Sequence, residues 1–224
     1  MVIIGDSLGL PRQTLDYEKT YTYLLKEKLP DWDIINRCRA GNTTRFQLNE
    51  KYVLSDLKFL KPDVVVMQFG IADCAPRLFS INQRRLIEVI GYFNSSLQDG
   101  IINFFSKHRY FFTKVFPKVY VKKEEFKKNM RKLIVITKSL GAIPIVINIA
   151  ASSLYTQKRS FGIFKNISDY NSIFVSKEII DVNSLGEEAL LENDHHLNEK
   201  ANVFITKKIM EKLYGNRRII SAVR

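Results

Sequence analysis

The segment at positions 63–69, DVVVMQF, places four apolar residues in a row near the middle of the chain. A strand with one face in water alternates apolar and polar residues, whereas a continuous apolar run is typical of a strand buried on both faces. Such a strand needs cover on both sides of its sheet, which helices usually supply. The run therefore indicates a parallel sheet between two layers of helices.

Other apolar segments along the chain support this fold class. We expect further strands at 2–4, 32–35, 143–149 and 178–181. Apolar residues at helical spacing predict helices at 17–29, 52–60 and 124–140, a short helix around 170–174, and a last helix capped by Asn198 that runs to Leu213. Strands that alternate with helices over the whole chain predict an α/β fold with five parallel strands covered on both faces.

The alternation is interrupted after the third strand. Positions 80–121 insert roughly forty residues there, far more than an ordinary connection, so we expect structure within the insertion, including a helix at 83–93. Open α/β sheets bind ligands beyond the carboxyl ends of their strands, which is where this insertion begins. We predict a single domain over 1–224, in which 80–121 serves as a lid or a docking surface.

Positive charge is concentrated in one stretch of the sequence. The formal net charge is +12, and positions 107–138 contain eleven Lys and Arg residues against two Glu residues, a net charge of +9. A solvated helix face explains such a run, as do an anionic substrate, a membrane surface or nucleic acid. The sequence shows no zinc-finger spacing, RNP-like aromatic motif or helix-turn-helix, so we expect no nucleic-acid partner.

Aromatic residues are interleaved with basic ones at 104–118. This composition suits peripheral contact with a membrane or with a protein partner, because rings can enter an interface while cations meet anionic groups. The competing interpretation is that the aromatic residues pack the insertion onto the rest of the domain.

The cysteines and the first residues bear on the compartment. Cys38 and Cys74 have no CxxC spacing and no partner histidines, which gives neither a disulfide framework nor a zinc site and favours a reducing compartment. We expect no metal and no cofactor. No secretory signal pattern opens the sequence and no apolar segment approaches the ~20 residues of a membrane span, so the expected location is the cytoplasm.

Ser7 belongs to a short polar motif, GDSL at 5–8, that follows the first predicted strand directly. At the carboxyl edge of a sheet a serine hydroxyl can project into a crevice and act as a nucleophile. A serine that only begins or caps a turn is the alternative.

Four more short motifs occur in order along the chain: Gly41 in RAGNTT, the GIAD turn at 70–73, Tyr170-Asn171, and His196-Leu197-Asn198. Together with GDSL they resemble the ordered blocks of the GDSL, or SGNH, hydrolases over nearly the whole chain. The resemblance implies a three-layer α/β/α, flavodoxin-like domain. It also implies a serine esterase, deacetylase or acyltransferase site at the carboxyl ends of the strands.

The resemblance assigns a role to each matched position. Ser7 would be the nucleophile and His196 the general base, while the backbone N–H groups of Ser7 and Gly41 would hold the oxyanion. Asp6 and Asp73 are expected to hydrogen-bond turn backbones rather than to take part in the chemistry.

Two positions depart from the family pattern. Ala72 stands where the family has an asparagine that donates to the oxyanion, and loss of one such donor costs about 10²–10³ in rate. Gln68, Asn42 or the insertion are candidate replacements. Asn193 stands where the family has the aspartate of the catalytic triad, and the corresponding change in a serine protease costs about 10⁴.

The string ENDHH at 192–196 offers two ways to support a histidine base. Either Asp194 or a backbone carbonyl orients His196, or the register shifts by one residue so that Glu192 supports His195. We favour His196 because the two residues after it match the family. Histidines that only begin a polar helix are the non-catalytic alternative.

Arg12 and Arg77 each follow a proline shortly after a candidate site loop. Both could hold a carboxylate or a phosphate of the substrate through two parallel hydrogen bonds, although a surface or ion-paired role explains them equally well.

These observations predict a serine hydrolase or acyltransferase, with hydrolysis favoured. It would act on an O-acyl ester, with O-acetyl as first choice, of a carbohydrate-like or other small-molecule substrate. The alternative is a catalytically weak SGNH-like binding or scaffold protein that docks an acidic glycan, a membrane surface or a protein partner.

Overall fold

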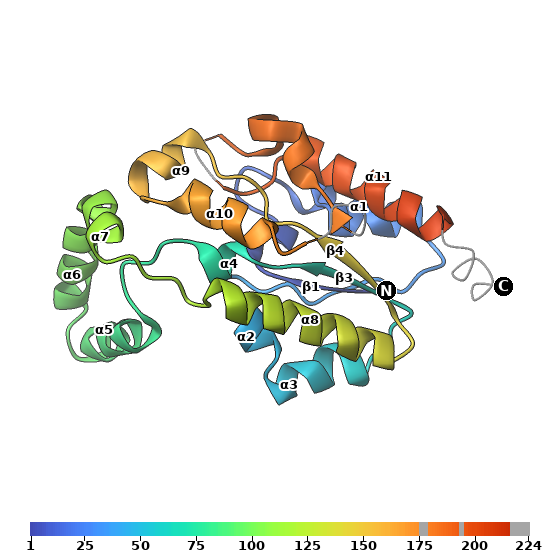
Figure 1. Cartoon of the computed structure of the whole chain (residues 1–224), viewed down its shortest axis with the longest axis horizontal. Coiled ribbons are helices and arrows are strands. Elements are labelled where there is room, and N and C mark those ends of the chain that lie inside the picture. Colours follow the sequence, from blue (N-terminus) through green and yellow to red (C-terminus); the bar gives the residue numbers. More distant parts are fainter. Residues whose placement is uncertain (175–178, 193–194, 216–224) are drawn as a thin grey trace.

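The computed structural model describes residues 1–174, 179–192 and 195–215 and has the predicted α/β architecture (Figure 1). Five parallel strands form one sheet in the order β2-β1-β3-β4-β5. They are β1 (Val2–Gly5), β2 (Ile35–Asn36), β3 (Val64–Gln68), β4 (Ile143–Ile147) and β5 (Ile179–Ile180). This flavodoxin-like order reverses between β1 and β3, and such a reversal is where α/β sheets bind ligands.

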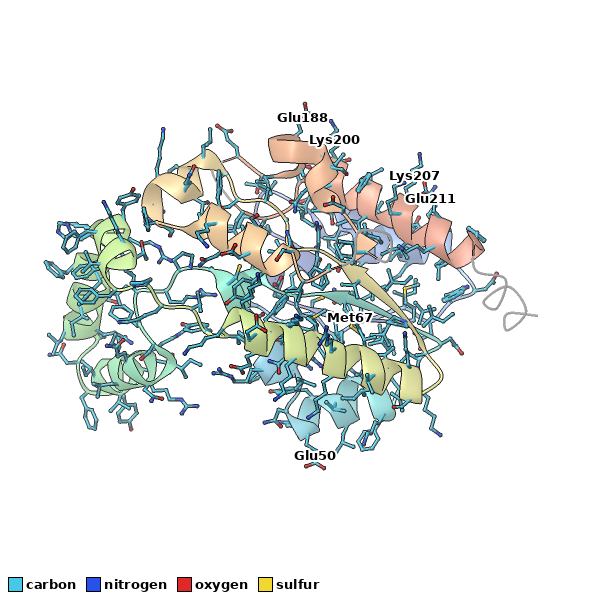
Figure 2. The ribbon with its side chains drawn as sticks, viewed as in Figure 1. Glu50, Met67, Glu188, Lys200, Lys207 and Glu211 are labelled. Atoms are coloured by element: carbon cyan, nitrogen blue, oxygen red, sulfur yellow. The ribbon has the colours of Figure 1, made fainter. Side chains whose placement is uncertain are left out.

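The two central strands carry the middle of the core. Val2 pairs with Ile35 on one side and with Val65 on the other. All residues of β1 and β3 are buried, which confirms the interpretation of the continuous apolar run. Met67 of β3 lies inside the molecule, whereas Glu50 and Glu188 project from its surface (Figure 2). Each fully buried apolar side chain stabilises the fold by about 1.5–3 kcal/mol.

Helices cover both faces of the sheet (Figure 1). On one face α1 (Tyr21–Lys28) packs against α11 (Glu199–Gly215). The other face carries α2 (Thr44–Gln47), α3 (Glu50–Val53) with its π-helical continuation η3 (Leu54–Lys58), and α8 (Lys123–Ser139), which α10 (Ile163–Asn171) contacts. The predicted cap of the last helix is confirmed, because Oδ1 of Asn198 accepts a hydrogen bond from the N–H of Ala201 at 3.1 Å.

The structure corrects three predicted elements. Thr20 has an extended backbone and caps α1, so the helix expected at 17–29 is divided into the 3₁₀ turn η2 (Tyr17–Lys19) and α1. The strand expected at 32–35 is shorter and lies later in the chain, because β2 consists of Ile35 and Asn36 alone. A short helix was expected around 170–174. The helix in this region, α10, lies earlier in the chain: it begins after Gly162, which has a φ of 82°, and it ends at Asn171. Residue 178 of the last predicted strand lies outside the described residues.

The insertion is helical, as expected, and extends to one side of the sheet domain (Figure 1). It consists of α5 (Ile81–Phe93), α6 (Ser95–Lys107) and α7 (Arg109–Val115). The ring of Phe105 packs on Phe79 and Phe112, whereas Phe104 and Phe111 are more than half exposed. Packing onto the domain therefore accounts for only some of the aromatic residues. None of the helices described here is both long enough and apolar enough to cross a membrane.

Candidate active site

A sharp turn at the carboxyl end of β1 presents Ser7, which begins the 3₁₀ helix η1 (Ser7–Gly9). Oδ1 of Asp6 accepts a hydrogen bond from the N–H of Leu8 at 3.0 Å, and the N–H of Asp6 donates to the carbonyl of Gln68 in β3 at 3.0 Å. A Cβ on Gly5 would lie 2.4 Å from that same carbonyl oxygen. The GDSL motif thus needs its glycine for close strand contact and its aspartate to cap the turn.

His196 faces this serine across the sheet edge. Oγ of Ser7 lies 3.1 Å from Nε2 of His196, although the two residues are 189 positions apart. The carbonyl of His196 accepts a hydrogen bond from the N–H of Leu191 at 2.8 Å, which holds the segment before α11 in place. The fold therefore brings together the two residues expected to form a nucleophile and a base.

The neighbouring residues of the ENDHH string are arranged differently. The ring of His195 stacks beside that of His196, with ring centroids 4.1 Å apart, and also lines the cavity in front of Ser7. Glu192 is exposed, and Asn193 and Asp194 lie outside the described residues. Of the two histidines, His196 is the one whose Nε2 lies at hydrogen-bond distance from the serine.

Arg12 contacts the same ring nitrogen. Its Nη2 lies within hydrogen-bond distance of Nε2 of His196. A guanidinium group can only donate, so in this contact Nε2 accepts and the proton of the neutral imidazole is on Nδ1. Ser7 and Arg12 therefore compete for the same lone pair of His196, so the contact with Arg12 weakens this histidine as a base for the serine proton.

Two backbone N–H groups are available beside Ser7. The N–H groups of Ser7 and Gly41 donate no hydrogen bond to any residue that the structure describes, and both residues line the cavity. The φ of Gly41 is 69°, a conformation that favours glycine. Asp73 fixes this loop, because its Oδ1 accepts hydrogen bonds from the N–H of Thr44 at 2.9 Å and from its hydroxyl at 2.6 Å.

The two aspartates bind turn backbones, as the sequence predicts, and both are fully buried. Burial raises the pKa of Asp6 to about 6, an effect partly offset by the hydrogen bond from Leu8. Burial likewise raises the pKa of Asp73 to about 7, against the hydrogen bonds from Thr44. Neither carboxyl group lines the cavity, so both act by shaping the loops that carry Ser7 and Gly41.

The amides considered as replacements for the missing oxyanion donor do not reach the cavity. Nδ2 of Asn42 donates to the carbonyl of Gly5 at 3.1 Å and to Oε1 of Gln47 at 2.9 Å, so it points into the protein. Gln68 is 1% exposed and does not line the cavity. Ala72 lines the cavity without a side-chain donor. Of the three candidates, neither Asn42 nor Gln68 lines the cavity, whereas the insertion does so through Arg109.

A cavity of about 480 Å³ opens in front of Ser7 and His196. Its wall includes residues of α4 (Ile71–Cys74), α7 and α9 (Leu154–Arg159). Four arginines line it: Arg12, Arg77, Arg109 and Arg159. The first two were candidates from the sequence, whereas the other two were not singled out.

The insertion reaches the cavity through Arg109. Its Nε donates to Oγ of Ser160 at 2.7 Å and its Nη2 donates to the carbonyl of Pro76 at 2.8 Å.

Among the described residues, no group of three or more His, Cys, Asp or Glu side chains is arranged to hold a metal ion.

Comparisons with known proteins identify the fold that carries these residues. No protein-family model matches the sequence, and no curated protein matches it. Among solved structures, a lipase/acylhydrolase from Enterococcus faecalis matches with a TM-score of 0.60 at 14% identity, covering 96% of this chain and 95% of that one. A GDSL-like lipase from Bacteroides thetaiotaomicron matches with a TM-score of 0.53 at 12% identity, covering 94% and 85%. The chain has the fold of the GDSL, or SGNH, hydrolases.

A third solved structure of this fold is Axe2, an acetylxylan esterase from Geobacillus stearothermophilus. It matches with a TM-score of 0.58 at 16% identity, covering 94% of this chain and 92% of that one. The SGNH fold thus extends over nearly all of the chain, and the resemblance drawn from the short motifs is confirmed at the level of the fold.

Proposed function

We propose that this protein is an ester hydrolase in which Ser7 is the nucleophile and His196 the general base. The observation that carries the proposal is the 3.1 Å separation of Ser7 Oγ and His196 Nε2 at the mouth of a cavity. Solved structures with the same fold include proteins described as a lipase, an esterase and acetylxylan esterases, which supports ester hydrolysis as the reaction class.

The reaction would proceed through an acyl-enzyme. Ser7 Oγ attacks the ester carbonyl carbon while its proton passes to Nε2 of His196. The N–H groups of Ser7 and Gly41 hydrogen-bond the oxyanion that forms, and each such donor contributes about 10²–10³ in rate. The bond to the alcohol oxygen then breaks, and the departing alkoxide takes the proton from His196.

Water completes the cycle. His196 takes a proton from the water molecule as its oxygen attacks the acyl carbon, and the Ser7 oxygen leaves and recovers a proton from the imidazolium. The products are the carboxylic acid and free Ser7. An acyltransferase would use a second alcohol in place of water, so the products of the reaction distinguish the two activities.

The substrate that we propose is an O-acetyl ester of a carbohydrate-like molecule. The acetylxylan esterases of the same fold support this choice. The cavity volume of about 480 Å³ is within the range of small-molecule sites, which bury ligands of this size.

Hydrolysis of phenyl acetate and of acetylated xylo-oligosaccharides by the purified protein tests the proposal. Ser7→Ala should lower kcat by at least about 10³-fold, while the unfolding temperature shifts by no more than about 3 °C. Ser96→Ala, on the exposed surface of α6, is the matched control and should keep full activity. A Ser7→Ala variant with half of the wild-type activity removes Ser7 from the mechanism, and a wild-type protein that releases no acetate favours a scaffold role.

A further inference from the structure

The cavity in front of Ser7 has an unbalanced charge. Arginines from four separate segments line it, and no Asp or Glu among the described residues does. None of the four forms an ion pair within the described part of the chain. By contrast, Arg39, Arg45 and Arg84 elsewhere in the molecule each pair with a carboxylate.

Neutral groups hold two of these arginines in place. Nη2 of Arg77 donates to the carbonyl of Ala72 at 2.8 Å, and its guanidinium carbon lies 4.4 Å from the centre of the Tyr120 ring. Arg109 is held by a serine hydroxyl and a carbonyl, as described above. These partners fix the guanidinium groups without neutralising them.

Two of the arginines also have N–H groups that donate no hydrogen bond to any described residue. The Nε atoms of Arg12 and Arg77 are buried and have no acceptor among the residues described. A buried donor without an acceptor is costly, by about 1–3 kcal/mol, unless water or a ligand supplies one. Arg77 thus contributes a charge to the cavity lining and also has a buried N–H group without an acceptor in the described part of the chain.

The positive charges of the arginines lie close enough to repel one another. Burial lowers the pKa of Arg77, and burial together with the charges of Arg77 and Arg159 lowers the pKa of Arg109. Positive groups gathered in a partly buried wall destabilise the free protein, which is typical of a binding site and not of a structural network. A bound oxyanion would relieve this repulsion and accept paired hydrogen bonds from the guanidinium groups.

We propose that the cavity selects esters that carry a separate anionic group, either a carboxylate or a phosphate. Arg77, Arg109 and Arg159 bind this group. This inference rests on the proposed function and names its substrate class: an O-acylated sugar acid or sugar phosphate fits both the ester chemistry and the arginines. The insertion therefore contributes to specificity, because α7 supplies Arg109.

The anionic group of the substrate also gives Arg12 a role. In the free protein Arg12 donates to Nε2 of His196, the atom that has to accept the proton of Ser7. A carboxylate or a phosphate is a stronger acceptor for a guanidinium than an imidazole nitrogen is, because the hydrogen bond then joins two opposite charges. Binding of the anionic substrate would draw Arg12 away and free the base.

Three aryl acetates that differ only in the para substituent test the selectivity: phenyl acetate, 4-acetoxybenzoate and 4-acetoxyphenyl phosphate. At least one anionic ester should have a kcat/KM about tenfold or more above that of phenyl acetate, equivalent to about 1.4 kcal/mol. The larger ratio distinguishes carboxylate from phosphate as the preferred group. Equal kcat/KM values for all three esters would overturn the proposal and leave the hydrolase intact.

Variants locate the selectivity. Arg159→Gln and Arg109→Gln should each reduce the ratio of anionic to neutral kcat/KM by about tenfold. Arg159 is exposed, and among the described residues its one hydrogen bond is to the Tyr155 hydroxyl, so its variant tests the proposal even where Arg109→Gln does not fold. Lys158→Gln removes the same charge from α9 outside the cavity wall and should leave the ratio unchanged. An equal fall in Lys158→Gln would show that a general positive field, and not a site, attracts the anion.

Binding without turnover separates this inference from the proposed function. Calorimetry of inorganic phosphate and 4-hydroxybenzoate with the wild type and with Ser7→Ala needs no catalysis. Binding that is lost in Arg159→Gln supports the oxyanion site even if no ester is hydrolysed. Absence of binding to both anions, or binding that persists in Arg159→Gln and Arg109→Gln alike, would overturn it.

Discussion

Replacement of Asp73 by asparagine should flatten the pH dependence of stability. Asp73 is a fully buried residue of α4, and its Oδ1 accepts two hydrogen bonds from Thr44, which follows the loop that carries Gly41. Asparagine keeps an acceptor oxygen at this position but cannot ionise. The substitution therefore removes the titration while it preserves the hydrogen bonds that hold the loop.

The direction and the size of this pH dependence follow from the raised pKa of Asp73. The ordinary pKa of an aspartate carboxyl group is 3.8, and that of Asp73 in the folded protein is about 7, so between these values the folded state binds more protons than the unfolded state. The free energy of unfolding then falls as pH rises from about 4 through about 7. One pKa unit corresponds to about 1.4 kcal/mol, which makes the contribution of Asp73 on the order of 4 kcal/mol. Asp6, with a pKa of about 6, adds a similar fall at lower pH in both proteins.

Urea unfolding measured from about pH 4 to about pH 8 tests this reasoning. The free energy of unfolding of Asp73→Asn should decline less steeply than that of the wild type, with a difference that grows up to about pH 7 and then stays constant. An unpaired amide N–H in the variant adds only a constant offset. Glu50→Gln, which removes an exposed carboxylate (Figure 2), is the control and should parallel the wild type. Parallel profiles for Asp73→Asn and the wild type would refute the account of this carboxyl group.

Three other perturbations probe the histidines, the ENDHH string and the insertion. His196→Ala should reduce kcat/KM for phenyl acetate far more than His195→Ala, because the His196 ring lies 3.1 Å from Ser7; the reverse ranking would identify His195 as the base. Asn193→Asp should raise turnover, since a carboxylate stabilises the imidazolium, and unchanged turnover would mean that another group already does so. The exposed rings and cations of the insertion predict co-sedimentation with anionic but not neutral vesicles, weakened by about 1 kcal/mol in Lys114→Glu. Equal recovery of protein in the supernatant with both lipids at low salt excludes a membrane contact.

Much of the sheet could be predicted because its signals are local. The apolar run of β3 must be covered on both faces wherever it occurs, so its sequence alone specifies its environment. The short strands and helices were harder to place. The beginning of α10 depends on Gly162 in a left-handed conformation, and the break before α1 depends on a hydrogen bond from the N–H of Tyr23 to the hydroxyl of Thr20. Neither feature alters the apolar spacing from which helices are predicted.

The position of the candidate site could be predicted where its residues follow strands directly. Ser7 and Gly41 come shortly after β1 and β2, and parallel strands bring their carboxyl ends to one edge. Arg109 and Arg159 could not be found in this way, because their position depends on how the insertion packs. One such contact is the hydrogen bond at 3.0 Å from the N–H of Phe161 to the hydroxyl of Thr113 in α7. In sequence the two arginines are part of ordinary basic surface segments.

The central claim is that Ser7 is a nucleophile activated by His196, and covalent labelling tests it most directly. A fluorophosphonate reacts when a serine oxygen attacks phosphorus and displaces fluoride, and mass spectrometry of the digested protein locates the adduct. We predict one phosphonyl adduct on Ser7 in the wild type, no adduct in Ser7→Ala, and much slower labelling in His196→Ala. A wild-type protein that stays unlabelled under conditions that fully label a known serine hydrolase, or one labelled at a different serine, would contradict the claim.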